Sequence, residues 1–464
     1  MFVRRKKRKF QKIIQQTMKN RFILLLSAVM ACAMPAAAEI FKAETFTLDN
    51  GLQCVVVENH KAPLVKHMLW YKVGSVDEEY GKGGSAHLLE HLMFRGTKRA
   101  AGNEFNRMME KNGVESNAFT SHEVTVYHEF ADVAKLEILM ALEADRMQNL
   151  AFSAEDYAAE QQIVLQERKQ RVENNPSAPF GERFNKILWG NLPYGHPVTG
   201  LSDEIMALTY DDIREFYQKF YAPNNAVLVI SGDVDAAMVK PLVQKYYGEL
   251  EKRDIARSEI PVNQEVFTET LKMALPDIQT VKMVQKSLLP PVAELGEAVY
   301  DYAVLAQYLG GGETSALYKE LVINQKTAVG VSADYHFVTK SNTVFAVTMI
   351  PTENDETQTE TAWESLAAAQ DESVRNLTAA KLEQIKRKIL ADLVYMNDNP
   401  EDAAYWIGYM LAMSFSLDDV QNYEENIRKV SLNGVKKAYA TLKSAPIVRG
   451  TLLPQKNNAA GKGK

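Results

Sequence analysis

Cysteine is scarce in this sequence of 464 residues, which contains only Cys32 and Cys54. Two cysteines exclude a cysteine-rich zinc site and a scaffold held together by disulfides. Long apolar runs are also lacking, because no stretch beyond the N-terminal region reaches the ~20 apolar residues that span a bilayer. The composition, 46% hydrophobic and 24% charged, is that of a globular protein. The length predicts two domains of roughly 200 residues each.

The first 38 residues differ from the rest of the chain. They contain nine basic residues and no acidic one, then an apolar stretch at 22–32 and three alanines at 36–38. This order predicts a secretory signal peptide over residues 1–38, and hence export to a bacterial periplasm. Two alternatives are an N-terminal membrane anchor and a lipoprotein attached through Cys32. Met18 is an alternative start of translation.

Without this segment the chain is acidic. The whole sequence has 53 basic and 59 acidic residues, and 44 basic residues remain once the nine are removed, for a net charge near −15. Such a charge repels nucleic acid and anionic membranes, so we expect neither as a partner. No stable membrane span is expected after signal removal. Cys54 would remain alone, which is compatible with an oxidising compartment but forms no internal disulfide.

A polar, proline-bearing segment at residues 251–262 predicts a linker between two domains, 39–250 and 263–455. Residues 456–464 are mostly small or polar and predict a disordered tail. Each half ends with a helix, a proline and a strand. The helix and strand are expected at 210–220 and 226–231 in the first half, and at 432–442 and 447–453 in the second.

This similarity indicates a duplicated domain. The first half also predicts a hairpin around Asn50 and Gly51, between strands at 46–48 and 52–57, because both residues tolerate positive φ. Further strands are expected at 65–73 and 124–130. Interleaved strands and helices with tight hairpins favour an α+β fold of two homologous domains. Each would be a mainly antiparallel sheet packed with helices.

The chemistry is concentrated in His87-Leu-Leu-Glu-His91. Glycines 83 and 84 break the chain just before a helix expected at 86–94, on which His87 and His91 lie one turn apart and face the same way. Two such imidazoles can share one zinc ion, which also accepts carboxylate ligands and leaves a position for water. Glu90 projects towards that face and can accept a proton from the water. The alternative is that the two histidines merely cap or pack a helix.

A third ligand must come from another segment. Glu160 and Glu167 lie seven residues apart in a helix expected at 156–172, so their carboxylates share a face. We predict that Glu167 completes the metal site, with one zinc ion per chain. Glu160 would orient a ligand or the water. A solvated charged stripe is the alternative for such a pair.

These motifs resemble those of the pitrilysin and insulinase family of metallopeptidases (inverzincins), especially its processing-peptidase-like branch of two-domain chains. In that family a glutamate ligand follows H-x-x-E-H by about 76 residues, the spacing from His91 to Glu167 here. Further matches are F-R-G-T at 94–97, N-A-F-T at 117–120, P-Y-G-H-P at 193–197 and L-G-G-G at 309–312. The resemblance implies a zinc site at His87, His91 and Glu167, with Glu90 as general base and Glu160 as its support.

The resemblance also implies where substrate binds. Asn117 and Ala118 would lie on an edge strand that receives an extended peptide through main-chain hydrogen bonds. Phe94 is placed to line the pocket beside the scissile bond, and a plain core aromatic is the equal alternative.

One feature of the family is missing. Active members carry an arginine and a tyrosine seven residues apart in the second domain, where they stabilise the oxyanion. The matching positions here are Val322 and Val329. The chain would therefore be weak or silent alone, or would form a heterodimer with a related chain that supplies both residues. Each chain would make half of a clamshell.

We therefore expect a zinc metalloendopeptidase that hydrolyses unfolded peptides, as the catalytic and zinc-bearing subunit of such a heterodimer. Glu90 would activate the attacking water at the metal. The alternative is a non-catalytic scaffold or core-type subunit that keeps the fold without the chemistry.

Overall fold

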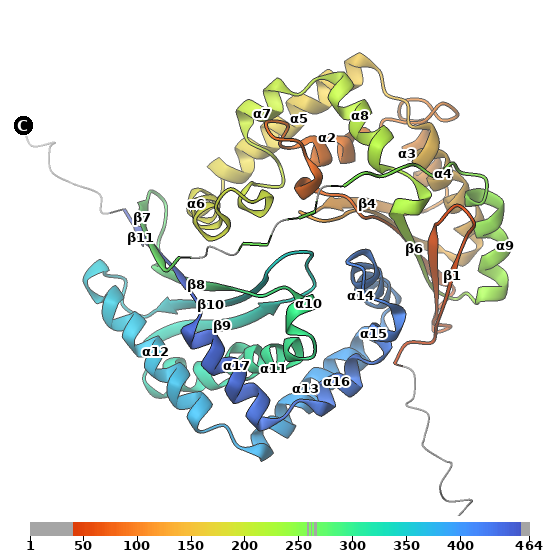
Figure 1. Cartoon of the computed structure of the whole chain (residues 1–464). Helices are drawn as coiled ribbons and strands as arrows, with labels where there is room; N and C mark the ends of the chain where they lie inside the picture. The colour runs from red at the N-terminus through yellow and green to blue at the C-terminus, as the bar shows by residue number, and fades with distance from the viewer. Residues whose placement is uncertain (1–39, 258, 261, 264–266, 456–464) are drawn as a thin grey trace, which may run out of the picture. The chain divides into compact units, whose positions relative to one another are not determined.

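The structure is a computed structural model that describes residues 40–257, 259–260, 262–263 and 267–455 (Figure 1). The predicted signal peptide and the predicted disordered tail lie outside the described residues. All elements discussed below belong to one compact unit that starts at Phe41. Within the described ranges, no helix is both long and apolar enough to cross a membrane.

The first half of the chain forms a six-stranded sheet with the order β1-β2-β6-β3-β5-β4. Its strands are β1 (Ala43–Thr47), β2 (Gln53–Glu58), β3 (Leu64–Tyr71), β4 (Glu115–Thr120), β5 (Thr125–Asp132) and β6 (Ala226–Gly232). β2 and β6 are parallel, and the other neighbours are antiparallel. The predicted β1–β2 hairpin is confirmed, with Gly51 at a φ of 90° in its turn.

The second half forms a five-stranded sheet with the order β7-β11-β8-β10-β9. Its strands are β7 (Glu269–Leu275), β8 (Lys282–Leu289), β9 (Ala328–His336), β10 (Thr343–Pro351) and β11 (Val448–Pro454). This order matches β2-β6-β3-β5-β4 of the first sheet, and β11 is parallel to β7 just as β6 is parallel to β2. The shared topology confirms the prediction of two homologous α+β domains with mainly antiparallel sheets.

Both halves also contain helices. Those of the first half are α2 (Ser85–Leu92), α3 (Glu104–Lys111), α4 (Leu136–Asn149), α5 (Ala154–Glu173), α6 (Ala178–Trp189), α7 (Ser202–Ala207), α8 (Tyr210–Phe220) and α9 (Ala236–Tyr247). Those of the second half are α10 (Val292–Leu295), α11 (Ala298–Gly310), α12 (Thr359–Arg375), α13 (Ala379–Asp398), α14 (Pro400–Ala412), α15 (Leu417–Gln421), α16 (Tyr423–Lys429) and α17 (Leu432–Ser444). A π-helical turn covers Tyr318–Asn324.

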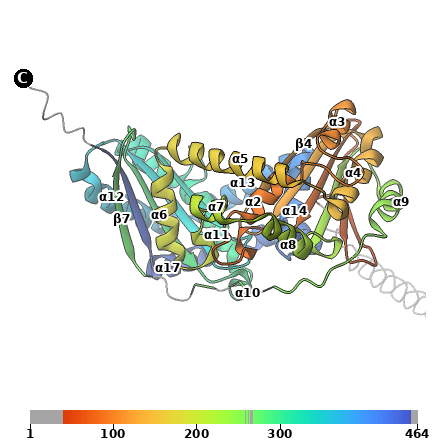
Figure 2. The same ribbon diagram turned by 90° about the horizontal axis from the view of Figure 1, so that it is seen from above.

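One helix from each half packs on the sheet of the other half. α6 packs on β7 and β11 of the second sheet (Figures 1 and 2). Its Phe180, Phe184 and Leu188 join one apolar cluster with Val284 and Leu452. α14 packs on β2, β3 and β6 of the first sheet. The predicted linker at 251–262 therefore separates the strands of the two sheets but not these helices. The domain limits at 39–250 and 263–455 stay predictions.

Close packing marks both crossings. A Cβ on Gly408 of α14 would lie 2.0 Å from Nε1 of Trp70 on β3. A Cβ on Gly450 of β11 would lie 2.6 Å from Cζ of Phe180 on α6. Glycine at each position lets helix and sheet approach more closely than any other residue would.

Candidate metal centre

The helix α2 starts where two local features require it. Gly84 has a φ of 92°, and a Cβ there would lie 2.8 Å from the carbonyl oxygen of Thr199. The half-buried Glu78 accepts hydrogen bonds on its carboxylate from the amides of Gly84 (3.1 Å) and Ala86 (2.9 Å). These bonds satisfy amides that the start of a helix leaves without partners. Since Leu88 is also fully buried, the start and the rotation of α2 are both fixed.

The three predicted metal ligands meet between α2 and α5. Nε2 of His87 lies 3.6 Å from Oε2 of Glu167, and Nε2 of His91 lies 3.3 Å from the same oxygen. One donor atom from each residue lies within 4.8 Å of the other two. His87 is buried, whereas His91 and Glu167 are half-buried. The site therefore has one wall in the core and one open side.

The donor set fits zinc. Nδ1 of His91 lies 3.0 Å from Oε2 of Glu160, so a proton on Nδ1 leaves the lone pair of Nε2 facing Glu167. Two acceptors then face each other, an arrangement that a cation between them stabilises. Two imidazole nitrogens and one carboxylate oxygen are a common ligand set for catalytic zinc.

The pKa values of His87 and His91 are shifted in opposite directions. Burial and the neighbouring His91 lower the pKa of His87 to about 4, so His87 is neutral near pH 7. Burial lowers the pKa of His91, but the hydrogen bond and charge of Glu160 outweigh burial and raise it overall. Burial raises the pKa of Glu160, and hydrogen bonds from His91 and Arg95 more than reverse that effect. Glu160 therefore remains a carboxylate that holds His91.

Arg95 is a functional candidate that sequence reasoning missed. Its Nε donates to Oε1 of Glu160 at 2.5 Å, and its guanidinium forms an ion pair with the same oxygen. Glu160 is thus bound by His91 on one oxygen and by Arg95 on the other. The only indication in the sequence is that Arg95 lies in F-R-G-T at 94–97, one of the segments that match the family pattern.

Glu90 is held by a second residue that was missed. The hydroxyl of Thr120, at the end of β4, donates to Oε2 of Glu90 at 2.5 Å. Burial raises the pKa of Glu90, and the bond from Thr120 partly opposes that rise. A carboxylate with a raised pKa is better matched to proton transfer near neutral pH. Thr120 also lies in a matched segment, 117–120.

The predicted substrate residues lie on β4, which ends its sheet and pairs with no described strand on its outer side. Asn117 is exposed and pairs with His128, whereas Ala118 is half-buried and pairs with Tyr127. The amide of Ala118 donates to the side-chain oxygen of Asn117 at 2.8 Å. Their role in binding peptide stays a prediction.

Phe94 packs against the core of the first half. Its ring centroid lies 6.0 Å from that of Tyr127 and 5.1 Å from the guanidinium of Arg146. These contacts describe a packed aromatic, and its role in lining a substrate pocket stays a prediction. Val322 is half-buried in the π-helical turn, and Val329 is 62% exposed at the start of β9. Neither side chain can donate a hydrogen bond to an oxyanion.

A buried ionic cluster lies beside Phe94, and no sequence pattern indicated it. Arg146 pairs with Glu143 at 2.6 Å and with Glu129 at 3.4 Å. His67 lies 2.8 Å from Glu129 through Nδ1 and 3.1 Å from the hydroxyl of Tyr247 through Nε2. Burial lowers the pKa of His67 to about 4.

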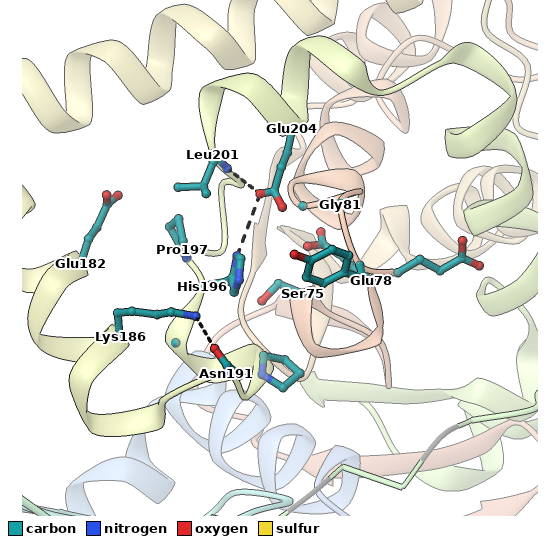
Figure 3. Close-up of a pocket in the computed structure, with 15 residues that line it drawn as sticks. Ser75, Glu78, Gly81, Glu182, Lys186, Asn191, His196, Pro197, Leu201 and Glu204 are labelled. Atoms are coloured by element: carbon teal, nitrogen blue, oxygen red, sulfur yellow. Dashed lines mark hydrogen bonds and ion pairs between the residues drawn. The ribbon is translucent and has the colours of Figure 1, made fainter.

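A cavity of about 890 Å³ lies beyond the start of α2 (Figure 3). Ser75, Glu78, Glu182, His196 and Glu204 are among its lining residues, and none of the three predicted metal ligands is. Its four carboxylates are already engaged: Glu78 with α2, Glu79 with Lys82, Glu182 with Arg168, and Glu204 with the amide of Leu201. The cavity is therefore distinct from the metal centre.

Comparisons with known proteins decide the family. The family model for insulinase (peptidase family M16) matches residues 54–200, and the model for the peptidase M16 inactive domain matches residues 207–389. The chain belongs to the pitrilysin and insulinase family of peptidases. The two models together cover more than half of the sequence, and the first contains the whole H-x-x-E-H helix and Glu167.

Individual proteins resemble this chain over most of its length. The zinc protease PqqE of Helicobacter pylori is 29% identical over 385 residues, which cover 82% of this chain and 86% of that protein. The crystal structure of a protease from Helicobacter pylori superposes with a TM-score of 0.79 and 26% identity, covering 89% of this chain and all of that one.

A peptidase M16 inactive domain from Pseudomonas fluorescens has the same fold, with a TM-score of 0.77 and 18% identity. The alignment covers 89% of this chain and 98% of that one. Because this fold also occurs in a protein described as inactive, the fold alone does not establish catalysis.

Proposed function

We propose that this chain is the zinc-bearing subunit of an endopeptidase that hydrolyses unfolded peptides. The observation that carries the proposal is the convergence of His87, His91 and Glu167, with one donor atom of each within 4.8 Å of the others. Glu90 lies on the same helix, one residue before His91. Membership of a family that includes a named zinc protease supports the proposal.

Each residue has a separate task. His87, His91 and Glu167 would hold one zinc ion, while Glu160 and Arg95 keep the His91 ring in place. Zinc, when bound, lowers the pKa of water and polarises a peptide carbonyl. Glu90 accepts the proton that water loses on attack and returns it to the leaving amine. Thr120 keeps the Glu90 carboxylate turned towards that position.

The open edge of β4 suits an unfolded substrate. An extended peptide would pair with Asn117 and Ala118 through its main chain, which every sequence offers. The amide of Ala118 would then exchange its bond with the Asn117 side chain for one with the substrate. Phe94 would contribute to the adjoining pocket.

A second chain completes the proposed enzyme. Val322 and Val329 leave the second half without donors for the oxyanion, so a related two-domain chain would supply arginine and tyrosine in a heterodimer. The two chains would enclose the peptide as the halves of a clamshell. The match of residues 207–389 to an inactive domain favours the alternative, a non-catalytic core-type subunit.

We further propose export to the periplasm through a signal peptide at 1–38, with lipidation at Cys32 as the alternative. The mature chain would then comprise domains at 39–250 and 263–455, joined at 251–262.

The test is to purify the native complex, weigh each chain by mass spectrometry and measure zinc per chain. We expect two related chains, zinc on this one alone, and peptide cleavage. Glu90→Gln should keep the zinc and abolish cleavage, because the amide is no base. Unchanged turnover after that substitution would refute the mechanism, and an active single-chain species would refute the heterodimer.

A further inference from the structure

The turn at residues 121–124, which joins β4 to β5, is attached to the segment that precedes α2. Within the turn, the amide of Ser121 donates to the carbonyl of Val124 at 2.8 Å. The amides of Ser75 and Val76 donate to the carbonyls of Ser121 (3.2 Å) and His122 (2.8 Å). The turn is therefore held by two main-chain bonds from the segment that leads to Glu78.

Two contacts that hold α2 and Glu90 involve residues connected to this turn. On one side, the attached segment continues to Glu78, whose carboxylate binds the first amides of α2. On the other side, Thr120 directly precedes the turn and binds Glu90. The turn is therefore linked to α2 in two ways: by main-chain hydrogen bonds to the segment of Glu78, and by the adjoining residue Thr120.

Glu123, inside the turn, connects it to the second half of the chain. Its side chain is 4% exposed. One carboxylate oxygen accepts three hydrogen bonds, from the hydroxyl of Tyr194 (2.5 Å), the hydroxyl of Thr339 (3.0 Å) and the amide of Lys340 (2.6 Å). The ammonium group of Lys340 also donates to the carbonyl of Glu123 at 3.4 Å.

Thr339 and Lys340 lie in the loop between β9 and β10, so this contact joins equivalent hairpins of the two sheets. Charge-assisted hydrogen bonds in a buried place are strong and directional. The loop of the second half therefore helps to hold the turn, together with Tyr194 and the segment that leads to Glu78.

We propose that Glu123 is a positioning residue through which the second half of the chain orients the general base. Glu123 holds the turn against the β9–β10 loop, and Thr120, at the edge of the same turn, holds Glu90. This inference rests on the proposed function, and it gives the second half a part in catalysis even though Val322 and Val329 cannot contact an oxyanion.

A purely structural tie between the halves is the competing explanation, and the chain offers one for comparison. The buried Lys66 on β3 pairs with Glu401 at the start of α14 at 2.6 Å. That ion pair also joins the halves, but none of its members lies in the turn or touches α2. Glu401→Gln is therefore a matched control, expected to weaken the tie without changing turnover.

The test uses the native complex with peptide substrate, and compares Glu123→Ala, Glu123→Gln and Thr339→Val with the wild type. We expect Glu123→Ala to lower kcat by about tenfold, with KM and zinc content unchanged, because a small displacement of a catalytic group is costly. Glu123→Gln retains an acceptor and should restore most of the rate. Thr339→Val removes one donor and should lower kcat by about threefold.

A double-mutant cycle separates positioning from general destabilisation. If Glu123 acts through Thr120, then Glu123→Ala in a Thr120→Val background should cost little more than Thr120→Val alone. Multiplied losses, or an unchanged kcat in Glu123→Ala, would overturn the proposal. Should Glu123→Ala not fold, the same cycle with Thr339→Val gives the answer.

A wild-type complex that cleaves no peptide would count against the proposed function and not against this connection. Hydrogen exchange then tests the connection by itself. Amides of β4 and of the start of α2 should exchange faster in Thr339→Val than in Glu401→Gln. Equal exchange in the two variants would overturn it.

Discussion

The hydroxyl of Thr120 donates to the carboxylate of Glu90 across 2.5 Å, and so joins the edge strand β4 to the helix that carries the metal ligands. The strand expected to receive the peptide and the residue expected to activate water are therefore in direct contact. In the proposed complex, substrate pairing along β4 would act on the position of Glu90 through this hydrogen bond.

Thr120→Val keeps the shape of the side chain and removes this bond. We expect kcat to fall by about tenfold while KM and zinc content stay the same, because Glu90 loses its orientation but the ligands do not. Steady-state kinetics of the native complex with metal analysis would check this. Thr120→Ser keeps the hydroxyl and should be close to wild type; a Val variant as fast as the Ser variant would contradict the assignment.

Arg95→Ala should weaken zinc binding. Without the guanidinium, Glu160 loses the partner of one oxygen and holds His91 less firmly, and outer partners of this kind typically contribute about tenfold or more to metal affinity. Competition with a chelating dye measures the zinc Kd without any need for turnover. Arg99→Ala is the control, because the Arg99 side chain is 81% exposed and lies 3.6 Å from Asp145, which is not one of the predicted site residues. Equal affinities in the two variants would exclude a role for Arg95.

His67 makes stability depend on pH. Its pKa is about 4 in the folded protein and ordinarily 6.5, so the unfolded chain binds the extra proton first. Its contribution is therefore complete above pH 6.5 and is lost as the pH falls towards 4, by about 3 kcal/mol in total. Burial shifts the pKa of Glu129 and of Glu143 upward, which acts in the opposite direction, so the wild type alone does not isolate His67.

The measurement is the free energy of unfolding of wild type and His67→Gln between pH 4 and 7, by denaturant titration. The variant should be less stable at pH 7, and the difference should shrink as the pH falls. Parallel curves across that range would show that His67 does not titrate as described.

Gly408→Ala should destabilise the protein by about 2 kcal/mol, as overpacking of a buried contact does. The added Cβ meets Trp70, which is fully buried and cannot move away, and this cost exceeds the gain of about 1 kcal/mol that alanine brings to a helix. Gly181→Ala is the control in the corresponding helix α6, where a Cβ meets nothing within 4 Å. That substitution should stabilise, and thermal unfolding of the two variants would show opposite signs.

That His87 lies beside His91, and Glu160 on the face of Glu167, was predictable from sequence, because helical periodicity places them so before any tertiary structure is known. The contacts of Arg95 and Thr120 were not, since each depends on how two separate elements pack. The pair Glu143 and Arg146 looks like an exposed i, i+3 pair in the sequence. Only the fold shows that both side chains are buried.

Sequence patterns also could not predict that α6 packs on the second sheet and α14 on the first. An apolar helix face reveals that the helix packs against something, but not against which sheet. The two sheets have the same topology, so each helix had two similar surfaces available.

Because α14 of the second half packs on the first sheet, that sheet can be covered only late in synthesis of the chain. The first sheet receives its last strand at Gly232, but the helix that covers it ends at Ala412. At ordinary rates of translation, roughly 10 to 40 s pass between the two. During that interval the nascent chain presents an apolar sheet face to the cell. A chaperone that binds extended or half-folded chains would therefore find its target in the first half, long after that half has been translated.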